Sequence, residues 1–522
     1  MQRSSSRPFT SLVLVLATSA SAACSSFGTN DDQPSPAPQA GNAAPGAGDA
    51  DASPPKAPVV TGTPDGSEIN ETLGVFVTVA GRPNAAGTRM DPLASLQAGI
   101  DLGRRLGKRV YACAGTYREA LVLADSISVI GGLDCSREEW RIGAARTRIE
   151  APASPAVQAD GITSATRLEG LDVVSPNAEA PSASSFGLIA RESPGLSIVS
   201  SRVESGSGQK GADGTEGIQL VQTGTLNGSN GRPQVDACFG ILCSKSGAPN
   251  TAGGTSICSG AAGHDGQAGG YGGTGGLYWW NYNGLEWRVY GTLRTLAELR
   301  AGGFPAVGID GASAPAQTIL SADGYTASNG SAGTDGARGT AGRGGDGLIP
   351  TIVNPPANPP GNVENPRWFG NSGAGGGAGG CPGLAGTPGM GGGASIAVLV
   401  VGAAIKIEKS DLLAHAGGSG GKGTFGSSPT PGGMPGADSA ALANTRGNPG
   451  TAGAASGVSG SGAGGPSYGL AFTAASPVLV ASTAKAGRGG DGLPEIAAVD
   501  ALGNAKTIPA SASGIAQDIQ QR

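Results

Sequence analysis

The chain has 522 residues, and its 95 Gly and 36 Pro together make up about a quarter of it. That content excludes an ordinary compact enzyme domain over the full length. Only 14% of the residues are charged and the formal net charge is -5, so the sequence lacks a basic surface that could neutralise nucleic-acid phosphates. We expect no nucleic-acid partner.

The first 23 residues have the pattern of a secretory signal peptide. Two arginines precede an apolar run over residues 12–17, and small residues follow it. Cys24 comes directly after Ser-Ala-Ala, which resembles a bacterial lipobox, in which the cysteine is diacylated and anchors the new N-terminus in a membrane. The usual lipobox has Leu where this chain has Ser21, so cleavage without lipidation stays open. The resemblance predicts an exported outer-membrane or cell-surface lipoprotein, and the alternative is a secreted protein.

Residues 24–70 are mostly Pro, Ala, Gly, Ser and Asp. A segment with so few large apolar side chains cannot bury enough surface to offset the entropy of ordering. It is therefore predicted to be a disordered tether.

The first ordered segment is a β-branched run over residues 75–79 that ends at Gly81 and Pro83. Next, an amphipathic helix is predicted, with Asp91 as its N-cap and with Leu93, Leu96, Ile100 and Leu106 near one face. The region then continues as short strands with no long helical segments between them, which disfavours a doubly wound α/β sheet. The predicted strands cover residues 109–112, 121–123, 127–130, 148–150, 171–174 and 196–199.

This region resembles the opening of pectin-lyase-like right-handed parallel β-helix proteins. The matching motif is V-Y-x-x-x-G-T-Y-x-E-x-L-x-L, formed here by Val110, Tyr111, Gly115, Thr116, Tyr117, Glu119, Leu121 and Leu123. The resemblance implies an all-β solenoid whose first coil is capped by the amphipathic helix. It divides the chain into a signal peptide (1–23), the tether (24–70), the first β-helix coils (71–205), glycine-rich insertions (206–392), further coils with glycine tracts (393–495) and a C-terminal tail (496–522). Because this fold carries lyases, hydrolases, adhesins and inert scaffolds, the resemblance does not identify an activity.

The cysteines also fit an exported protein. Without Cys24 there are six, an even number that can form three disulfides in an oxidising compartment. Cys113 and Cys135 are 22 residues apart, about one turn of such a β-helix, and coils stacked about 4.8 Å apart fall within the range for a disulfide. We therefore predict a bridge between these two. The pairing of the other four stays open: Cys238, Cys243, Cys258 and Cys381.

Three later segments follow one plan. They start at Ser185, Ser395 and Ser467 with apolar residues, reach a second serine at Ser201, Ser410 and Ser482, and then run into glycine. This plan predicts a repeated unit of two short strands followed by a glycine-rich excursion, which buries its apolar face only by stacking on neighbouring units.

Glycine in these excursions recurs at every third residue, for example from Gly330 to Gly345 and from Gly417 to Gly426. A period of three matches an extended polyproline-II helix with glycine along one edge. Two interpretations follow, packed bundles of such helices or mobile surface loops. Since glycine carries the largest ordering cost, we expect mobile loops.

Catalytic patterns are missing from the sequence. The two histidines, His264 and His415, lie in no recognised motif, and neither zinc-ligand spacing nor a nucleotide-binding loop is present. The clustered acid motifs of β-helix polysaccharide hydrolases are missing too. We expect no catalytic residues, no metal and no cofactor.

One segment is rich in aromatic residues. It lies beside a glycine tract and contains Tyr278, Trp279, Trp280, Tyr282, Trp287 and Tyr290. Aromatic platforms stack on sugar rings, so these residues are candidates for carbohydrate binding. The alternative is that they form a small core of their own or cover one end of the stack, and we expect that packing role.

These features predict a non-catalytic structural or adhesive protein of the cell surface or extracellular matrix. Its expected partners are a membrane, through Cys24, and polysaccharide or other envelope components. One alternative is a polysaccharide lyase or hydrolase of the β-helix class, and a second is a carbohydrate-binding surface protein.

Overall fold

The computed structural model describes residues 63–137, 139–233, 249–259, 263–273, 305–316, 319–347, 371–438, 446–499 and 504–522, together with the backbone of five short strands between these ranges. The chain divides into the units Met1–Ser53 and Pro54–Arg522, and every described residue belongs to the second. The expected signal peptide, Cys24 and most of the expected tether therefore lie outside the described residues.

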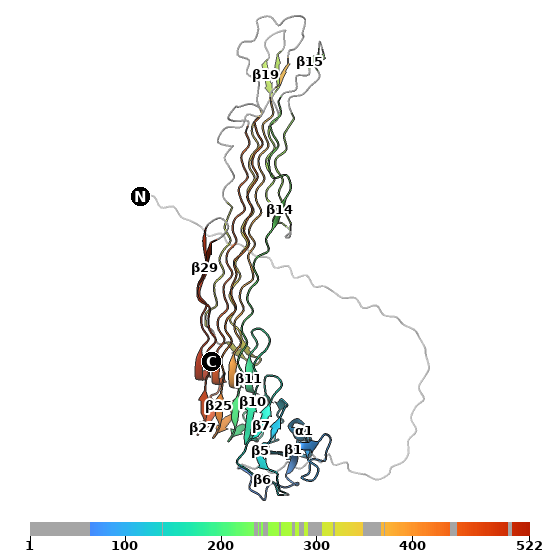
Figure 1. Cartoon of the computed structure of the whole chain (residues 1–522), viewed down its shortest axis with the longest axis vertical. Helices are drawn as coiled ribbons and strands as arrows, with labels where there is room; N and C mark the ends of the chain where they lie inside the picture. The colour runs from blue at the N-terminus through green and yellow to red at the C-terminus, as the bar shows by residue number, and fades with distance from the viewer. Residues whose placement is uncertain are drawn as a thin grey trace, which may run out of the picture. The chain divides into compact units, whose positions relative to one another are not determined.

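Parallel sheets dominate the structure, which confirms the predicted β-rich class (Figure 1). Sheet A contains β1 (Gly74–Arg82), β2 (Arg109–Cys113), β5 (Val129–Asp134), β9 (Thr166–Glu169), β12 (Leu196–Val199), β24 (Lys406–Glu408) and β27 (Val478–Val480), with β6 (Arg141–Ile142) antiparallel to β5. Sheet B contains β3 (Thr116–Tyr117), β7 (Thr147–Glu150), β10 (Leu171–Val174), β13 (Arg202–Glu204), β25 (Asp411–Leu413) and β28 (Thr483–Lys485). Sheet C contains β4 (Leu121–Val122), β8 (Val157–Asp160), β11 (Ser185–Arg191), β23 (Ser395–Val401), β26 (Ser467–Phe472) and β31 (Ala516–Gln521).

Successive strands are shared out among the three sheets in a fixed order. From β7 to β13 the chain visits sheets B, C and A in turn, and it continues in the same order through β23 to β28. Each strand pairs in parallel with the strand that occupies the same place one circuit later. The inward rows of the sheets are apolar and buried, as in the sheet B row of Ile149, Val173, Val203 and Leu412. This alternation buries one face of most strands of sheets A to C in a common core.

Helix α1 (Leu96–Leu106) is the expected amphipathic helix, but its N-cap is Ser95 and not Asp91. Asp91 instead accepts the Ala86 N–H and pairs with Arg82. The carboxylate of Glu119, from the turn after β3, accepts the Leu96 N–H at 2.6 Å and the Ser95 hydroxyl at 2.7 Å. A negative charge at this end satisfies free N–H groups and complements the helix dipole. Leu96 and Ile100 are buried, whereas Leu106 is exposed.

The two sets of serines stack, which confirms that the three segments are equivalent units. Ser185, Ser395 and Ser467 are register partners in sheet C. The Oγ of Ser410 accepts the Ser201 N–H, and the Oγ of Ser482 accepts the Ser410 N–H, each at 3.1 Å. The units differ from the prediction in one respect, since each has a third strand, β13, β25 or β28, between its second serine and its glycine tract.

Smaller antiparallel pairs occur within the glycine-rich regions and near the C-terminus. They are β14 (Val221–Thr223) with β17 (Ile257–Ser259), β15 (Cys238–Phe239) with β16 (Leu242–Cys243), β20 (Ile319–Ser321) with β21 (Gly324–Thr326), β29 (Ile496–Val499) with β30 (Ala505–Ile508), and the three strands β18 (Leu277–Trp280), β19 (Trp287–Tyr290) and β22 (Arg367–Phe369). The C-terminal residues 496–522, expected to be a tail, thus contribute a hairpin and the last strand of sheet C.

Candidate functional site

The glycine tracts connect the end of sheet B strands to the start of sheet C strands. They leave after β13, β25 and β28 and return before β23, β26 and β31, and Figure 1 shows them running side by side. We call the described tracts the glycine segments; they cover residues 205–231, 249–259, 263–273, 305–316, 327–347, 371–393, 414–437, 446–466, 486–493 and 509–515.

Segment 371–393 lies at the centre of a bundle. Its consecutive residues Gly375, Gly376 and Gly377 donate their N–H groups to three different segments, at Ser229, Gly270 and Asn448, over 2.8, 2.9 and 3.0 Å. Their carbonyl groups accept N–H groups from three others, at Gly436, Gly254 and Gly342. Six neighbours around one extended chain is the arrangement expected of three-residue-per-turn helices whose donors and acceptors point outward in rotation.

The expectation that these tracts are mobile loops is therefore wrong. It treated each tract alone, for which the conformational cost of ordering glycine is not repaid. In the bundle the central segment gains hydrogen bonds and close van der Waals contacts along its length. Both ends of an excursion are also held by paired strands, so strand pairing in the sheets already offsets the entropic cost of closing the loop.

Glycine is required because the backbones approach too closely for a side chain. A Cβ on Gly376 would lie 2.1 Å from the carbonyl oxygen of Gly342 and 2.6 Å from its carbon. A Cβ on Gly379 would lie 2.0 Å from the oxygen of Gly339, one triplet further along. Residues 373–383 are all buried, although they include hardly any large apolar side chain. Backbone packing therefore forms most of the interior of this bundle.

Polar side chains complete the hydrogen bonding at the edges. The Oδ1 atoms of Asp213, Asn227 and Asn230 accept the N–H groups of Lys422, Met434 and Ala437 in a neighbouring segment, at 2.7, 2.8 and 2.8 Å. Each of these three acceptors directly precedes a glycine. Sequence reasoning missed them, and the signal that could have found them is an Asx-Gly pair inside a triplet tract.

Two disulfides are present among the described residues. The predicted Cys113–Cys135 bridge is confirmed, with a Cα–Cα distance of 5.8 Å. Cys258 of β17 is bonded to Cys381 of segment 371–393, a pairing that the sequence left open. Leu220 packs against this second bridge. The register of β15 and β16 places Cys238 opposite Cys243, but their side chains lie outside the described residues.

The structure describes the aromatic segment through the backbone of strands β18 and β19. Tyr282 and the side chains of Tyr278, Trp279, Trp280, Trp287 and Tyr290 lie outside the described residues. The backbone adds one observation, because β22 pairs with β18 and sets Trp368 opposite Tyr278 and Phe369 opposite Leu277. Trp368 and Phe369 therefore join the same small sheet, although they lie about ninety positions after their register partners.

Charged side chains gather on the outer face of sheet B. One residue from each of the six strands stands in register there, in a line that we call the charged row: Thr116, Arg148, Asp172, Arg202, Asp411 and Thr483. Arg148 pairs with Asp172 at 2.6 Å and with Glu150 at 2.9 Å. The Arg148 hydrogen bond lowers the pKa of Glu150.

Glu204 and His415 lie beside the charged row, and the Nε2 of His415 is 2.7 Å from Oε1 of Glu204. Burial opposes ionisation of Glu204, but the hydrogen bond from His415 and the positive charge of Arg202 outweigh it and hold the pKa below its ordinary value. A general acid at neutral pH needs the reverse, a carboxyl whose pKa is raised. Glu150 and Glu204, whose pKa values are lowered, are therefore unsuited to that role.

Acid should weaken the fold partly through Glu204. Because its folded-state pKa is below the unfolded value of about 4.3, its stabilising contribution is complete above that pH and disappears as pH falls through the folded-state pKa. We expect Glu204→Gln to lower the free energy of unfolding by about 1 kcal/mol at pH 7 and by much less at a pH below the folded-state pKa of Glu204. Urea unfolding at both pH values measures this, with Glu495→Gln as the control. An equal loss of unfolding free energy at both pH values would show that the charge of Glu204 does not contribute to stability.

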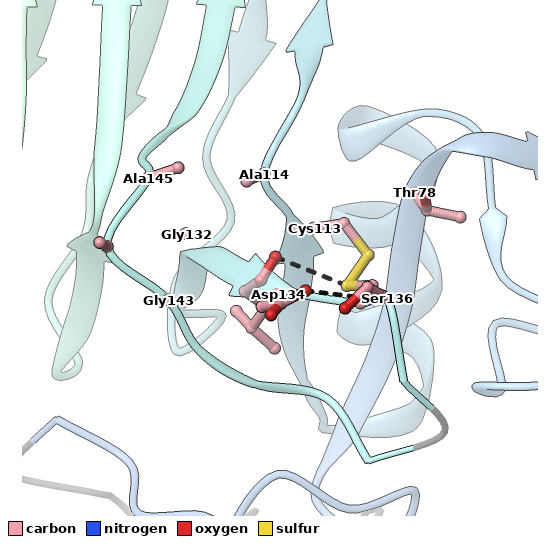
Figure 2. A pocket seen from close by; sticks show the side chains of 11 residues that line it. Thr78, Cys113, Ala114, Gly132, Asp134, Ser136, Gly143 and Ala145 are labelled. Carbon is pink, nitrogen blue, oxygen red and sulfur yellow. Dashed lines mark hydrogen bonds between the residues drawn. A yellow bond between two sulfur atoms is a disulfide. The ribbon is translucent and has the colours of Figure 1, made fainter.

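A cavity of about 430 Å³ opens beside the Cys113–Cys135 disulfide (Figure 2). Small side chains and backbone from the ends of β2 and β5 line it, with Asp134 as its one carboxylate. Asp134 accepts the Ser136 N–H at 3.0 Å, and this bond lowers its pKa. The cavity brings together no second titratable group.

The two histidines have different partners. The Nε2 of His264 lies 3.4 Å from Oδ2 of Asp335, between two glycine segments, whereas His415 follows β25. Among the described residues no three His, Cys, Asp or Glu side chains form a group that could hold a metal ion. In the same part of the chain, no helix has the length and apolar character needed to cross a membrane.

Comparison of the chain with family models, with curated proteins and with solved structures found no match.

Proposed function

We propose that this chain is a non-catalytic structural protein of the cell surface or extracellular matrix, exported and held at a membrane by a lipid on Cys24. The observation that carries the proposal is the glycine bundle. More than a hundred residues are devoted to an element whose interior is backbone, and whose central segment is bonded to six neighbours. Such an element presents few reactive groups, and its order depends on packing along its whole length.

The sheets support a right-handed parallel β-helix as the base of this scaffold. Strands pass through sheets B, C and A in turn, each pairs in parallel with its successor one circuit on, and the serines of equivalent units stack. Stacked units of this kind gain their core from their neighbours. In this proposal the β-helix anchors both ends of every glycine excursion, and the excursions project as one bundle.

A second candidate function is adhesion to glycans through the sheet of β18, β19 and β22. The pairing of β22 with β18 favours it, because it adds Trp368 and Phe369 to a sheet already rich in aromatic residues. Aromatic rings supply the stacking surface that sugar rings use.

One assay tests both functions. The full-length chain, with its disulfides intact, is incubated with acidic and neutral polysaccharides, with and without Ca²⁺, and both new reducing ends and bound sugar are measured. We expect no reducing ends above those produced with the denatured chain. Turnover above that control would overturn the structural proposal and favour a lyase or hydrolase.

The binding arm compares the wild type with a Trp279→Ala, Trp280→Ala variant. Tyr271→Ala is the matched control, since Tyr271 is an exposed aromatic residue on the adjoining glycine segment, with 66% of its surface accessible. Glycan adhesion predicts that binding is lost in the double variant and kept in the control. Binding that both variants retain would place the adhesive surface elsewhere.

A further inference from the structure

We propose that the outer face of sheet B is the contact surface for a second copy of this chain, related to the first by a twofold axis. The proposal goes beyond the structural role and is independent of it. It rests on the order of side chains along the charged row, which reads Thr, Arg, Asp, Arg, Asp, Thr from β3 to β28.

This order is complementary to itself when it is reversed. A twofold axis that runs parallel to the strands, between the two facing sheets and midway between β10 and β13, sets the row against its own reverse. The facing pairs are then Arg148 with Asp411 of the partner subunit, Asp172 with Arg202 of the partner subunit, and Thr116 with Thr483 of the partner subunit. Every charge meets its opposite, and hydroxyl meets hydroxyl at both ends. A twofold contact requires this kind of self-complementary patch.

The row keeps charges available for such a contact. Asp411 accepts the Thr483 hydroxyl at 2.7 Å, and among the described residues no ion pair is found for it. Arg202 pairs at 2.7 Å with Glu204 of its own strand, although Asp172 and Asp411 are its neighbours in the row. The side chains of Arg148 and Arg202 are 40% and 42% exposed. The charges are therefore only partly used within the chain.

The other two sheets lack these properties. The corresponding outer row of sheet A is Arg167, Ser197, Lys406 and Val478, which is not complementary to its own reverse, and its two cations pair with Glu169 and Glu408 of their own strands. The outer face of sheet C is apolar, with Phe186, Ile189 and Leu399, and it is covered by Leu320 and Tyr325 of the β20–β21 hairpin. Among the described residues, sheet B thus has an outer row that is at least partly exposed and complementary in charge to its own reverse.

A contact built on such pairs should be specific and sensitive to salt. Partly solvated ion pairs each contribute little, and they are screened over about 10 Å at 0.1 M salt. Charge complementarity chiefly selects the partner and its orientation. We therefore expect a reversible dimer that dissociates as salt rises from about 0.05 M to about 0.5 M.

Sedimentation equilibrium of the purified full-length chain tests the proposal, with Cys24→Ser in every sample so that no lipid can drive association. Asp411→Lys places Lys opposite Arg148 of the partner subunit twice per dimer, and it should weaken dimerisation at least tenfold. Glu495→Lys makes the same charge change at an exposed position outside sheet B and should leave dimerisation unchanged. Arg148→Glu alone should also weaken it. An equimolar mixture of the Asp411→Lys and Arg148→Glu chains should form a heterodimer, because both facing pairs are then opposite in charge.

A second measurement does not depend on the folding of the Arg148→Glu chain. In a chain with Thr116→Cys and Thr483→Cys, a thiol crosslinker that spans about 10 Å should join two copies, since packed sheets lie about that far apart. The same two positions within one chain are five strand spacings apart, about 24 Å, and cannot be joined by that reagent. A covalent dimer is the expected product.

Three results would overturn the proposal. The first is a wild-type chain that stays monomeric at low salt, and the second is a dimer that Asp411→Lys leaves intact. The third is a dimer that Glu495→Lys weakens as much as Asp411→Lys does, which would assign association to net charge. Turnover in the polysaccharide assay would overturn the structural role but would leave these dimerisation results unaffected.

Discussion

Replacing Gly376 by alanine is expected to disrupt the glycine bundle and to cost about 3 kcal/mol or more of its stability. The new Cβ would lie 2.1 Å from the Gly342 oxygen, which is backbone held by its own hydrogen bonds and cannot rotate away. Relief requires two segments to separate. Because segment 371–393 touches six others, that separation breaks hydrogen bonds on several sides at once.

Hydrogen exchange of the bundle amides, together with urea unfolding, measures this effect. Protection should fall along the neighbouring segments and not only at residue 376, since the bonds are shared. Ala332→Val is the matched control, because Ala332 is an exposed position of a glycine triplet and a larger side chain there meets solvent. If the Gly376 variant exchanged like the wild type, the close packing of these backbones would be refuted.

Removing the Cys258–Cys381 disulfide is expected to destabilise the chain more than removing Cys113–Cys135. The first bridge closes a loop with a sequence separation of 123 and the second a loop with a separation of 22. In the chain-entropy description these loops correspond to about 5 and about 3 kcal/mol of stabilisation. The first bridge also crosses from β17 to the central glycine segment, where Leu220 provides one of the few apolar contacts of the bundle.

Paired Cys→Ser variants, unfolded in urea without reductant, compare the two bridges. We expect the Cys258→Ser, Cys381→Ser chain to lose exchange protection in the glycine segments while sheets A to C stay folded. The Cys113→Ser, Cys135→Ser chain should lose it first near β2 and β5. The reverse order of stability, or no change in the bundle when Cys381 is replaced, would show that the bundle does not depend on its bridge.

The expected effects of Gly376→Ala and of losing the Cys258–Cys381 disulfide both follow from the way the glycine bundle is packed. A bundle with a backbone interior has no reserve of side-chain packing that can adjust to a defect, unlike an apolar core that repacks around a new methyl group. Its stability therefore depends on many equal bonds and on a few fixed points, namely the anchoring strands and the disulfide.

The sequence by itself was sufficient for the local and repetitive features. Short β-branched runs predicted the strands, because alternation along a strand needs only neighbouring residues. The spacing of the serines predicted equivalent units, and Ser185, Ser395 and Ser467 are register partners. The separation of Cys113 and Cys135 predicted their bridge, since one repeat length sets which residues stack.

Only the tertiary structure decided what brings distant segments together. The N–H groups of Gly375 and Ala378 bond to Ser229 and Leu226, about 150 residues earlier, and no local pattern encodes such a pairing. For the same reason the sequence favoured mobile loops, because the ordering cost of glycine is local whereas the bonds that offset it come from other segments. The charged row likewise arises from six strands between Thr116 and Thr483, and its order exists only once parallel pairing has set their register.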